Sequence, residues 1–441
     1  MPEDSKGLSG WRRTCYSIDV NPSLEGKEVT LFGRVVSIRE QGGITFIILQ
    51  DMKGIVQVTI QRDKSPTSVL DTIGGLKPYS SLGVRGYVRS ISKAPHGAEI
   101  APSDIKILDE PRKKLPFDPY GKAEQSIDKR LDLRSIDLFR PQSQAIFKIK
   151  SAVLQTMRQF LHEEGFIEVN TPKIIASATE GGAALFPLLY YDKEAFLAQS
   201  PQLYKEQLAN VFEKVFEMGS IFRAEQFRTL KHLSEAISVD IEQAYVTYAD
   251  VMELLERMIS NVIASLNLGC KEELSVLKIK LEPPQLPLKR ITYDDVLKIL
   301  AKEGVKIEWG DDLSTAHLKS YSKIFPDYHF IIDWPTTSKA FYLKPKESNP
   351  KICESFDFMH GSIELASGGS RISDRKELAK RLVEKGLNPK NFEYHLKIFD
   401  YGMSPHAGFG LGLDRLIMVL TGVENIREVV LFPRDPQRLT P

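Results

Sequence analysis

The sequence predicts an α+β protein, in which a small N-terminal β-barrel precedes a larger domain built on an antiparallel sheet flanked by helices. Two observations support this fold class. Between residues 28 and 108 the chain reads as short strand patterns separated by turn residues. After residue 140, strand patterns follow one another across polar loops and longer helical patterns lie between them, which favours local antiparallel pairing over a doubly wound parallel sheet.

The barrel strands are expected at residues 29–39, 43–50, 55–61, 83–92 and 99–108. Turn signals such as Gly42-Gly43 and Lys53-Gly54 separate them. A helix-compatible stretch at residues 68–73 falls between the third and fourth strands, where an OB-fold carries its helix. We therefore expect residues 1–108 to form an OB-fold domain.

Residues 109–140 are rich in charge and proline, so we expect a hinge or linker there. Residues 141–441 then form the second domain. Its first helix is expected at residues 145–164, where apolar residues recur at helical spacing. The later elements are expected as strands at residues 214–223 and 234–245, helices at 248–266, 293–303 and 376–385, and a strand–turn–helix at 408–420.

The composition excludes several classes of protein. The chain has 441 residues, is 42% hydrophobic and carries a net charge of +1. Its apolar runs fall short of the roughly 20 residues that a membrane span needs, and the N-terminus lacks the apolar centre of a signal peptide. We therefore expect a cytoplasmic protein without a membrane segment. Cys15, Cys270 and Cys353 are too far apart for a zinc knuckle or a disulfide framework.

Two distant segments predict a site for a nucleoside triphosphate that is not a P-loop. Arg223 ends one strand pattern and would lie with Glu225 and His232 at the loop end of a hairpin. Arg415 opens the helix after residue 412. A planar guanidinium supplies fixed positive charge where charge builds on an α-phosphate. An arginine alone at a strand end is more often a surface ion pair, but the whole pattern favours the site.

Further residues fit the same site. Gly408, Gly410 and Gly412 alternate, which lets a backbone or a ligand lie flat against one face of a strand. Glu364 and Ser367 offer the hard oxygen ligands that a magnesium ion bridging phosphates would use, although a strand-end glutamate and a turn serine are the plainer interpretation.

Six motifs, in order, resemble those of the class II aminoacyl-tRNA synthetases, and specifically the archaeal-type aspartyl-tRNA synthetases (aspartate–tRNA(Asp/Asn) ligases). They are residues 179–182, 199–205, 222–225, 364–369, 408–415 and 432–435. The resemblance covers nearly the whole chain. It implies an N-terminal OB-fold that binds the anticodon and a C-terminal class II catalytic domain.

The resemblance also implies an activity. Aspartate and ATP with magnesium give aspartyl-adenylate and pyrophosphate, and the aspartyl group passes to the terminal adenosine of tRNA(Asp). The implied catalytic residues are Arg223 and Arg415. The other implied ATP contacts are Glu225, His232, Glu364 and Gly412, with Glu364 and Ser367 as magnesium ligands. The implied aspartate contacts are Glu180, Gln202, Lys205, Asp240, Ser367 and Arg371. Pro172 resembles the proline at the interface of a homodimer.

The choice of amino acid depends on charge. Lys205 and Arg371 would stabilise a side-chain carboxylate, whereas neutral asparagine would leave a buried cation unpaired. Two alternatives stay open. One is an enzyme of the same fold with another product, such as an asparaginyl-tRNA synthetase or a divergent paralogue. The other is a catalytically silent tRNA-binding protein.

In the barrel, the resemblance implies that Phe46 stacks on the central anticodon base and that Gln57 and Glu99 read its edge. The alternative is that Phe46 packs in the barrel core. Whether tRNA(Asn) is also charged depends in this family on a few residues. Pro95 resembles the relaxed type, whereas Val36 matches neither pattern well. The resemblance therefore favours relaxed specificity, with tRNA(Asn) as a second partner beside tRNA(Asp).

The chain departs from the family pattern beside the first arginine. Gln226-Phe227-Arg228 and Lys231-His232 replace the usual residues of that loop. Ala236-Ile237 stands where an aromatic residue is usual shortly before Asp240, so adenine stacking would rest on other residues. Asp414 replaces a glutamate. These departures keep the phosphate-binding arginines and put ATP affinity and loop contacts with tRNA in question.

Overall fold

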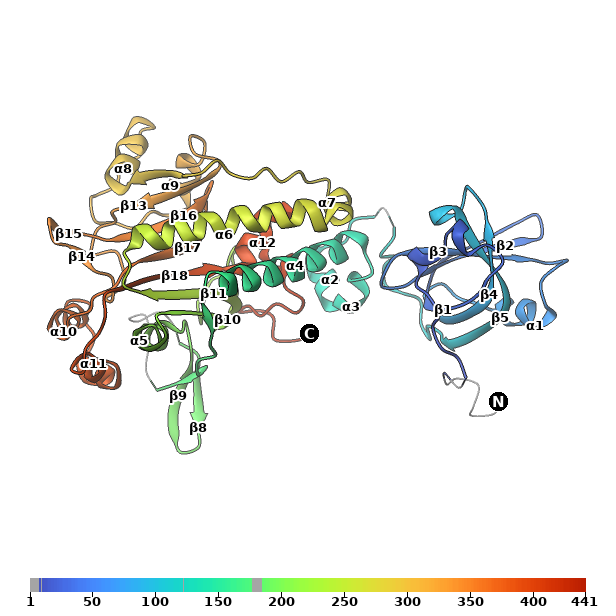
Figure 1. Cartoon of the computed structure of the whole chain (residues 1–441), viewed down its shortest axis with the longest axis horizontal. Helices are drawn as coiled ribbons and strands as arrows, with labels where there is room; N and C mark the ends of the chain where they lie inside the picture. Colours follow the sequence, from blue (N-terminus) through green and yellow to red (C-terminus); the bar gives the residue numbers. More distant parts are fainter. Residues whose placement is uncertain (1–7, 9, 122, 177–184) are drawn as a thin grey trace. The chain divides into compact units, whose positions relative to one another are not determined.

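The computed structural model describes residue 8 and residues 10–121, 123–176 and 185–441 (Figure 1). The chain forms two compact units, residues 1–124 and residues 125–441. None of the helices in the described ranges combines the length and the apolar character that a bilayer crossing requires.

The first unit is a closed barrel with the strand order β1-β2-β3-β5-β4. Its elements are β1 (Glu28–Gln41), β2 (Ile44–Gln50), β3 (Ile55–Gln61), α1 (Thr67–Ile73), β4 (Ser81–Ser90), η4 (Pro95–Gly97) and β5 (Ala98–Asp109). Alternate strand residues such as Leu31, Ile47 and Val58 are fully buried and fill the barrel. The OB-fold and its strands are therefore confirmed, with boundaries within a few residues of those predicted.

The stretch predicted as a hinge, residues 109–140, contains two short helices, α2 (Ile127–Asp132) and α3 (Arg134–Asp137). Both belong to the second unit. Arg134 is buried, and its guanidinium donates to Asp137 Oδ2 at 2.6 Å and to the carbonyl of Leu431 at 3.0 Å. Charges that suggest a solvated linker in the sequence are thus satisfied inside the fold.

The large sheet of the second unit has the strand order β12-β13-β16-β17-β18-β11-β10-β6. Its strands are β6 (Ile167–Glu168), β10 (Lys214–Phe222), β11 (Glu235–Ala244), β12 (Lys289–Thr292), β13 (Tyr328–Ile332), β16 (Ser355–His360), β17 (Ile363–Ser370) and β18 (His406–Gly412). The central pairs are antiparallel, whereas β12–β13 and β10–β6 are parallel. This confirms the α+β prediction.

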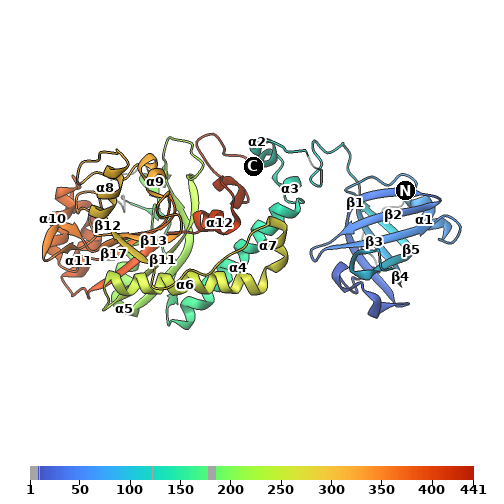
Figure 2. The ribbon, with the colours of Figure 1, turned by 90° about the horizontal axis from the view of Figure 1, so that it is seen from above.

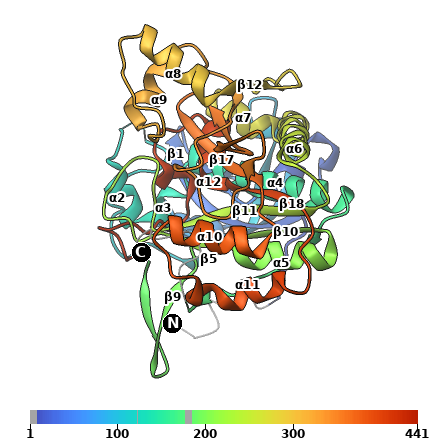
Figure 3. The same ribbon diagram turned by 90° about the vertical axis from the view of Figure 1, so that its left-hand side faces the viewer.

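Two smaller sheets accompany the large one. One has the strand order β7 (Ile174–Ile175), β9 (Lys193–Leu197), β8 (Pro187–Tyr190), and the other pairs β14 (Pro345–Lys346) with β15 (Asn349–Cys353). The hairpin of β8 and β9 projects from the second unit (Figure 3).

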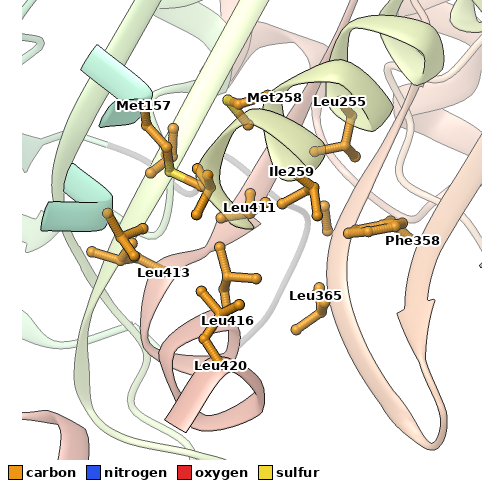
Figure 4. Packing of buried hydrophobic residues seen from close by; sticks show 14 of the residues in the cluster. Met157, Leu255, Met258, Ile259, Phe358, Leu365, Leu411, Leu413, Leu416 and Leu420 are labelled. Carbon is orange, nitrogen blue, oxygen red and sulfur yellow. The ribbon is translucent and has the colours of Figure 1, made fainter. Parts of the chain in front are cut away.

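The helices of the second unit begin with α4 (Pro141–Glu163), which starts earlier than predicted because proline is well tolerated in a first helical turn. The others are α5 (Gln202–Phe212), α6 (Tyr248–Gly269), α7 (Lys271–Leu277), α8 (Tyr293–Lys302), α9 (Thr315–Tyr321), α10 (Arg375–Glu384), α11 (Glu393–Phe399) and α12 (Leu413–Thr421). Helices α4 and α6 lie side by side (Figures 1 and 2). Their apolar faces meet β18 and α12 in the main core, where Met157, Met258 and Leu411 are buried (Figure 4).

The other face of the sheet is polar at its centre. Asp240 on β11 pairs with Gly410 on β18, Gly410 pairs with Ser367 on β17, and Ser367 pairs with Asp357 on β16. Directly opposite residues of neighbouring strands share a face, and successive residues alternate. The row therefore lies on one face, while Leu411, next to Gly410, enters the core.

Candidate functional site

A cavity of about 310 Å³ lies over this polar row. Residues of α5, β11, β17, β18 and α12 line it, together with the loop between β10 and β11. The predicted site residues among them are Gln202, Arg223, Glu225, His232, Asp240, Glu364, Ser367, Arg371, Gly412 and Arg415. Segments that are far apart in the sequence thus meet at one cavity.

Positive charge gathers around Arg223 and Arg415. Arg415 donates from Nη1 to the carbonyl of Glu364 at 3.0 Å. Burial lowers the pKa of Arg415, Glu364 partly offsets this, and nearby Arg223 lowers the pKa further. Burial and Arg415 also lower the pKa of His232, so its imidazole is neutral at pH 7. Guanidinium groups held close together in a cavity favour a bound polyanion.

A second group of charges is paired and buried. Lys205 Nζ donates to Asp240 Oδ1 at 2.8 Å and to the carbonyl of Phe409 at 3.1 Å. Arg371 donates from Nε and Nη2 to the two carboxylate oxygens of Glu242, at 2.9 and 3.1 Å. Burial opposes the charge on Arg371, but Glu242 outweighs it and raises the pKa. Asp240 and Arg371 line the cavity, whereas Lys205 contacts it through Asp240.

A buried carboxylate that the sequence analysis missed holds Gln202. Gln202 donates from Nε2 to Glu206 Oε1 at 2.6 Å, and Glu206 Oε2 lies 3.2 Å from His395 Nε2 and 3.8 Å from His406 Nε2. Burial alone would raise the pKa of Glu206, but the two histidines lower it. An ionised carboxylate only accepts hydrogen bonds, so the Gln202 amide turns its NH₂ to Glu206 and leaves its carbonyl oxygen for other donors. The i, i+4 spacing of Gln202 and Glu206 was the available signal.

Glu364 and Ser367 lie near another carboxylate that the sequence analysis missed, Asp357 on β16. Asp357 is buried opposite Ser367, and Lys339 Nζ donates to both of its oxygens at 2.6 Å. Burial raises the pKa of Asp357 to about 6, against the influence of Lys339. The available signal was an acidic residue between two phenylalanines in an apolar strand, since such residues are rarely buried without a partner.

The three alternating glycines of β18 are needed for different structural reasons. A Cβ at Gly408 would lie 2.3 Å from Glu242 Oε2, and one at Gly410 would lie 3.1 Å from Asp240 Oδ1. At Gly412 a Cβ would meet no atom closer than 3.8 Å. Gly408 therefore makes room for the backbone carbonyl of Ile241, at 2.2 Å, as well as for Glu242, which holds Arg371. Gly410 makes room for Asp240, which holds Lys205, and Gly412 borders the cavity itself.

Some predicted residues lie elsewhere. Glu180 is outside the described residues. Pro172 is exposed, follows the edge strand β6 and does not line the cavity. Asp414, which stands where a glutamate was expected, accepts from Lys150 Nζ at 2.5 Å and from the backbone NH of Ile237 at 2.9 Å, so it ties α12 to α4 and β11.

The loop after Glu225 turns its atypical residues in different directions. Arg228 donates to Asp128 at 2.8 Å and to Gln437 at 2.9 Å. Phe227 is 52% exposed, and its ring meets the His232 ring edge-on at 5.3 Å between centroids. Ala236, where an aromatic residue is usual, lines the cavity.

In the barrel, Gln57 and Glu99 lie together. Gln57 Nε2 donates to Glu99 Oε2 at 2.8 Å, and Thr59 Oγ1 donates to the same oxygen at 2.5 Å. Phe46 pairs with Thr59 and shares its face, while the next residue, Ile47, is fully buried. Phe46 is partly exposed on the outer face, so the alternative that it packs in the barrel core is wrong.

Comparisons with known proteins bear on both units. The family model "tRNA synthetases class II (D, K and N)" matches residues 126–436. The model "OB-fold nucleic acid binding domain" matches residues 29–108. Two curated relatives, each an aspartate–tRNA(Asp/Asn) ligase, come from Archaeoglobus fulgidus and Methanothermobacter thermautotrophicus. The first is 49% identical over 97% of this chain and 99% of its own length, and the second is 46% identical over 98% of this chain and 100% of its own length.

Solved structures of similar fold include the asparaginyl-tRNA synthetase of Pyrococcus horikoshii complexed with asparaginyl-adenylate. It has a TM-score of 0.91 and 33% identity, covering 98% of this chain and 100% of that one. The aspartyl-tRNA synthetase of Entamoeba histolytica has a TM-score of 0.87 and 29% identity, covering 100% and 96%.

Proposed function

Because the chain belongs to the class II tRNA synthetases of the D, K and N group and carries an OB-fold nucleic acid binding domain, we propose that it is a ligase that forms aspartyl-tRNA. In the first step a carboxylate oxygen of aspartate attacks the α-phosphorus of ATP, and pyrophosphate leaves. In the second, a ribose hydroxyl of the 3′ adenosine of the tRNA attacks the carbonyl carbon of the aspartyl-adenylate, the hydroxyl loses its proton, and AMP leaves. The observation that carries the proposal is that Arg223 and Arg415 share one cavity with Arg371 and Asp240.

Arg223 and Arg415 are the catalytic residues of the first step. Their fixed charges would stabilise the negative charge that builds on the α-phosphate and on the departing pyrophosphate. His232 can donate a hydrogen bond from a ring N–H to a phosphate oxygen. Glu225 and Gly412 line the same cavity and complete the ATP contacts.

The oxygen-rich end of the cavity fits a magnesium ion. Glu364 and Ser367 line the cavity, and the buried Asp357 on β16 lies opposite Ser367. Together they offer two carboxylates and a hydroxyl, which are hard oxygen ligands of the kind that Mg²⁺ prefers. A bound magnesium ion would neutralise charge on the phosphates. Glu364 and Ser367 would then serve both the metal and the substrates.

Aspartate would lie where Arg371 and Asp240 face the cavity. Glu242 holds the Arg371 guanidinium in one orientation through two of its five N–H groups, so the remaining donors can meet the side-chain carboxylate of the substrate. Asp240, with Glu180, would accept from the substrate ammonium, and so would the carbonyl oxygen of Gln202. Lys205 acts on this group by fixing Asp240.

Asparagine is the second candidate substrate, because an asparaginyl enzyme has so similar a fold. The buried charges favour aspartate. The side-chain amide of asparagine is neutral, so it would leave the remaining N–H donors of Arg371 facing an uncharged group. Sites built to pair a charged substrate group with buried donors reject mismatched substrates strongly.

The anticodon would bind the outer face of the barrel, with Phe46 stacking on a base and the Gln57–Glu99 pair reading an edge. We include tRNA(Asn) with tRNA(Asp) as a substrate, supported by relatives named for both tRNAs and by Pro95. The proposal also includes a cytoplasmic homodimer with Pro172 at the interface, beside the exposed edge strand β6.

The test is ATP–pyrophosphate exchange with aspartate or asparagine, followed by charging of both tRNAs. Arg223→Ala and Arg415→Ala should each lower exchange by about 10²–10³-fold, the size of effect seen when a transition-state donor is lost. Arg375→Ala, in an exposed ion pair with Glu393, is the matched control and should retain exchange. A folded wild-type protein that exchanges with asparagine but not with aspartate would contradict the proposal.

A further inference from the structure

We propose that Lys339 is a built-in competitor for the divalent cation. Its ammonium group neutralises Asp357 in the metal-free protein, so that a divalent cation binds weakly alone and tightly with ATP. This inference rests on the proposed function, since it places ATP and a metal ion in the cavity.

The first observation is the position of the ammonium group. Lys339 Nζ lies 2.6 Å from each carboxylate oxygen of Asp357, the same oxygens that a metal ion would need. A cation that contacts both oxygens at once occupies the side of the carboxylate that a bidentate metal ion would approach.

The second observation is that this pair is enclosed. The side chain of Lys339 is 14% exposed and that of Asp357 is 4% exposed. Lys339 Nζ also lies 4.0 Å from the centroid of the buried Trp334 ring, a favourable place for a cation. The ammonium group is therefore held between a carboxylate and an aromatic face, and water screens it less than it would a surface pair.

The third observation is the charge balance. Asp357 and Glu364 bring two negative charges to this end of the cavity, and both act on Lys339. A divalent cation that enters without ATP meets a positive charge already bound to one carboxylate. With ATP, the phosphates add negative charge that offsets this repulsion and give Lys339, which lines the cavity, a second anionic partner.

The experiment is a titration of the metal-free protein with Mn²⁺, followed by electron paramagnetic resonance, without ATP, amino acid or tRNA. Lys339→Met should bind Mn²⁺ at least about tenfold more tightly than wild type, because a like charge at contact distance is removed. Lys346→Met is the matched control. It removes the same charge from a partly buried pair with Asp333, at 2.7 Å, and should leave Mn²⁺ affinity unchanged.

Thermal unfolding in EDTA and in Mn²⁺ gives a second readout. Lys339→Met and Lys339→Gln should melt lower than wild type in EDTA and recover most of the loss in Mn²⁺, whereas Lys346→Met should gain no such recovery. If one Lys339 variant does not fold, the other carries the test. Unchanged or weaker Mn²⁺ binding in the folded Lys339 variant would overturn the inference. Wild-type exchange is assayed in parallel, so a failure of the proposed function is seen separately.

Discussion

Gly408 lies directly opposite Glu242 across the β11–β18 pairing, and a Cβ at position 408 would lie 2.3 Å from Glu242 Oε2 and 2.2 Å from the backbone carbonyl oxygen of Ile241. The same carboxylate receives both hydrogen bonds from Arg371. Because position 408 carries no side chain, Glu242 can lie where it holds the buried guanidinium of Arg371. The pairing of β11 with β18 thus links the glycine motif to the part of the cavity where we propose that aspartate binds.

Gly408→Ala should therefore weaken aspartate binding more than ATP binding. The added methyl group would press on the backbone carbonyl of Ile241 as well as on Glu242, so β11 must shift and Glu242 would release Arg371. We therefore expect KM for aspartate to rise about tenfold, and stability to fall by about 1–3 kcal/mol from overpacking. Pyrophosphate exchange at varied aspartate and varied ATP separates the two constants. Gly412→Ala is the control, because its Cβ meets nothing within 3.8 Å and should leave stability and KM for aspartate unchanged. Equal effects of the two variants on aspartate would contradict the link.

The cluster of Glu206 with His395 and His406 should make stability depend on pH. Burial alone would lower the pKa of His406, but Glu206 outweighs it and raises the pKa, while the histidines lower the pKa of Glu206. The contribution of Glu206 is fully present above its unfolded pKa of about 4.5, and that of His406 below its unfolded pKa of about 6.5. The contribution of His406 to stability is lost as pH rises through its raised pKa. The contribution of Glu206 is lost as pH falls through its lowered pKa.

Glu206→Gln should accordingly lose about 3 kcal/mol, the usual cost of breaking a buried pair, with the largest loss between about pH 4.5 and 6.5. Urea unfolding of the wild type and of Glu206→Gln from pH 5 to pH 9 measures the difference in their free energies of unfolding. This difference should become smaller toward high pH. Glu282→Gln, in an exposed pair with Lys280, should show no such dependence. A loss that is constant with pH would mean that the histidines do not act on Glu206.

The elements of the fold could be predicted from the sequence because each carries a local signal. The barrel strands alternate and end at turn residues, and Arg223 and Arg415 stand in motifs with fixed spacing. The ion pair of Lys339 with Asp357 could not be predicted in this way. Lys339 lies in the loop before β14 and Asp357 lies on β16, so only the fold brings them together. Their contact depends on tertiary packing, which overrides local pattern.

The place of Lys205 shows the same limit. The sequence indicates a cation near the amino acid, but Lys205 lies on helix α5 and donates its hydrogen bond to Asp240 on strand β11. The helices α2 and α3 lie in a stretch whose charges suggest a linker, because the partners of Arg134 come from the far C-terminal part of the chain.

Phe46→Ala should weaken tRNA binding without changing adenylate formation. Stacking of a base on an aromatic side chain contributes about 1–3 kcal/mol, so KM for tRNA(Asp) should rise at least about fivefold. Charging assays at varied tRNA give this constant, and pyrophosphate exchange without tRNA should match wild type. Tyr87→Ala removes another exposed aromatic residue of the barrel and serves as the control. An equal rise of KM for tRNA(Asp) in Phe46→Ala and Tyr87→Ala would mean that the effect is not specific to Phe46.

Phe227 should support adenine binding. Ala236 and Ile237 on β11 border the cavity, but neither has an aromatic ring to stack on a base, and Ile237 also packs against the main core. Phe227 lies half exposed in the loop before β11, with its ring centroid 5.3 Å from that of His232, which lines the cavity. Phe227→Ala should therefore raise KM for ATP about tenfold, the loss expected for one stacking contact, with KM for aspartate unchanged. Phe212→Ala, equally exposed at the end of α5, should change neither constant. If Phe227→Ala leaves KM for ATP at the wild-type value, adenine is held without this ring, and Phe227→Trp should then bring no gain in ATP affinity.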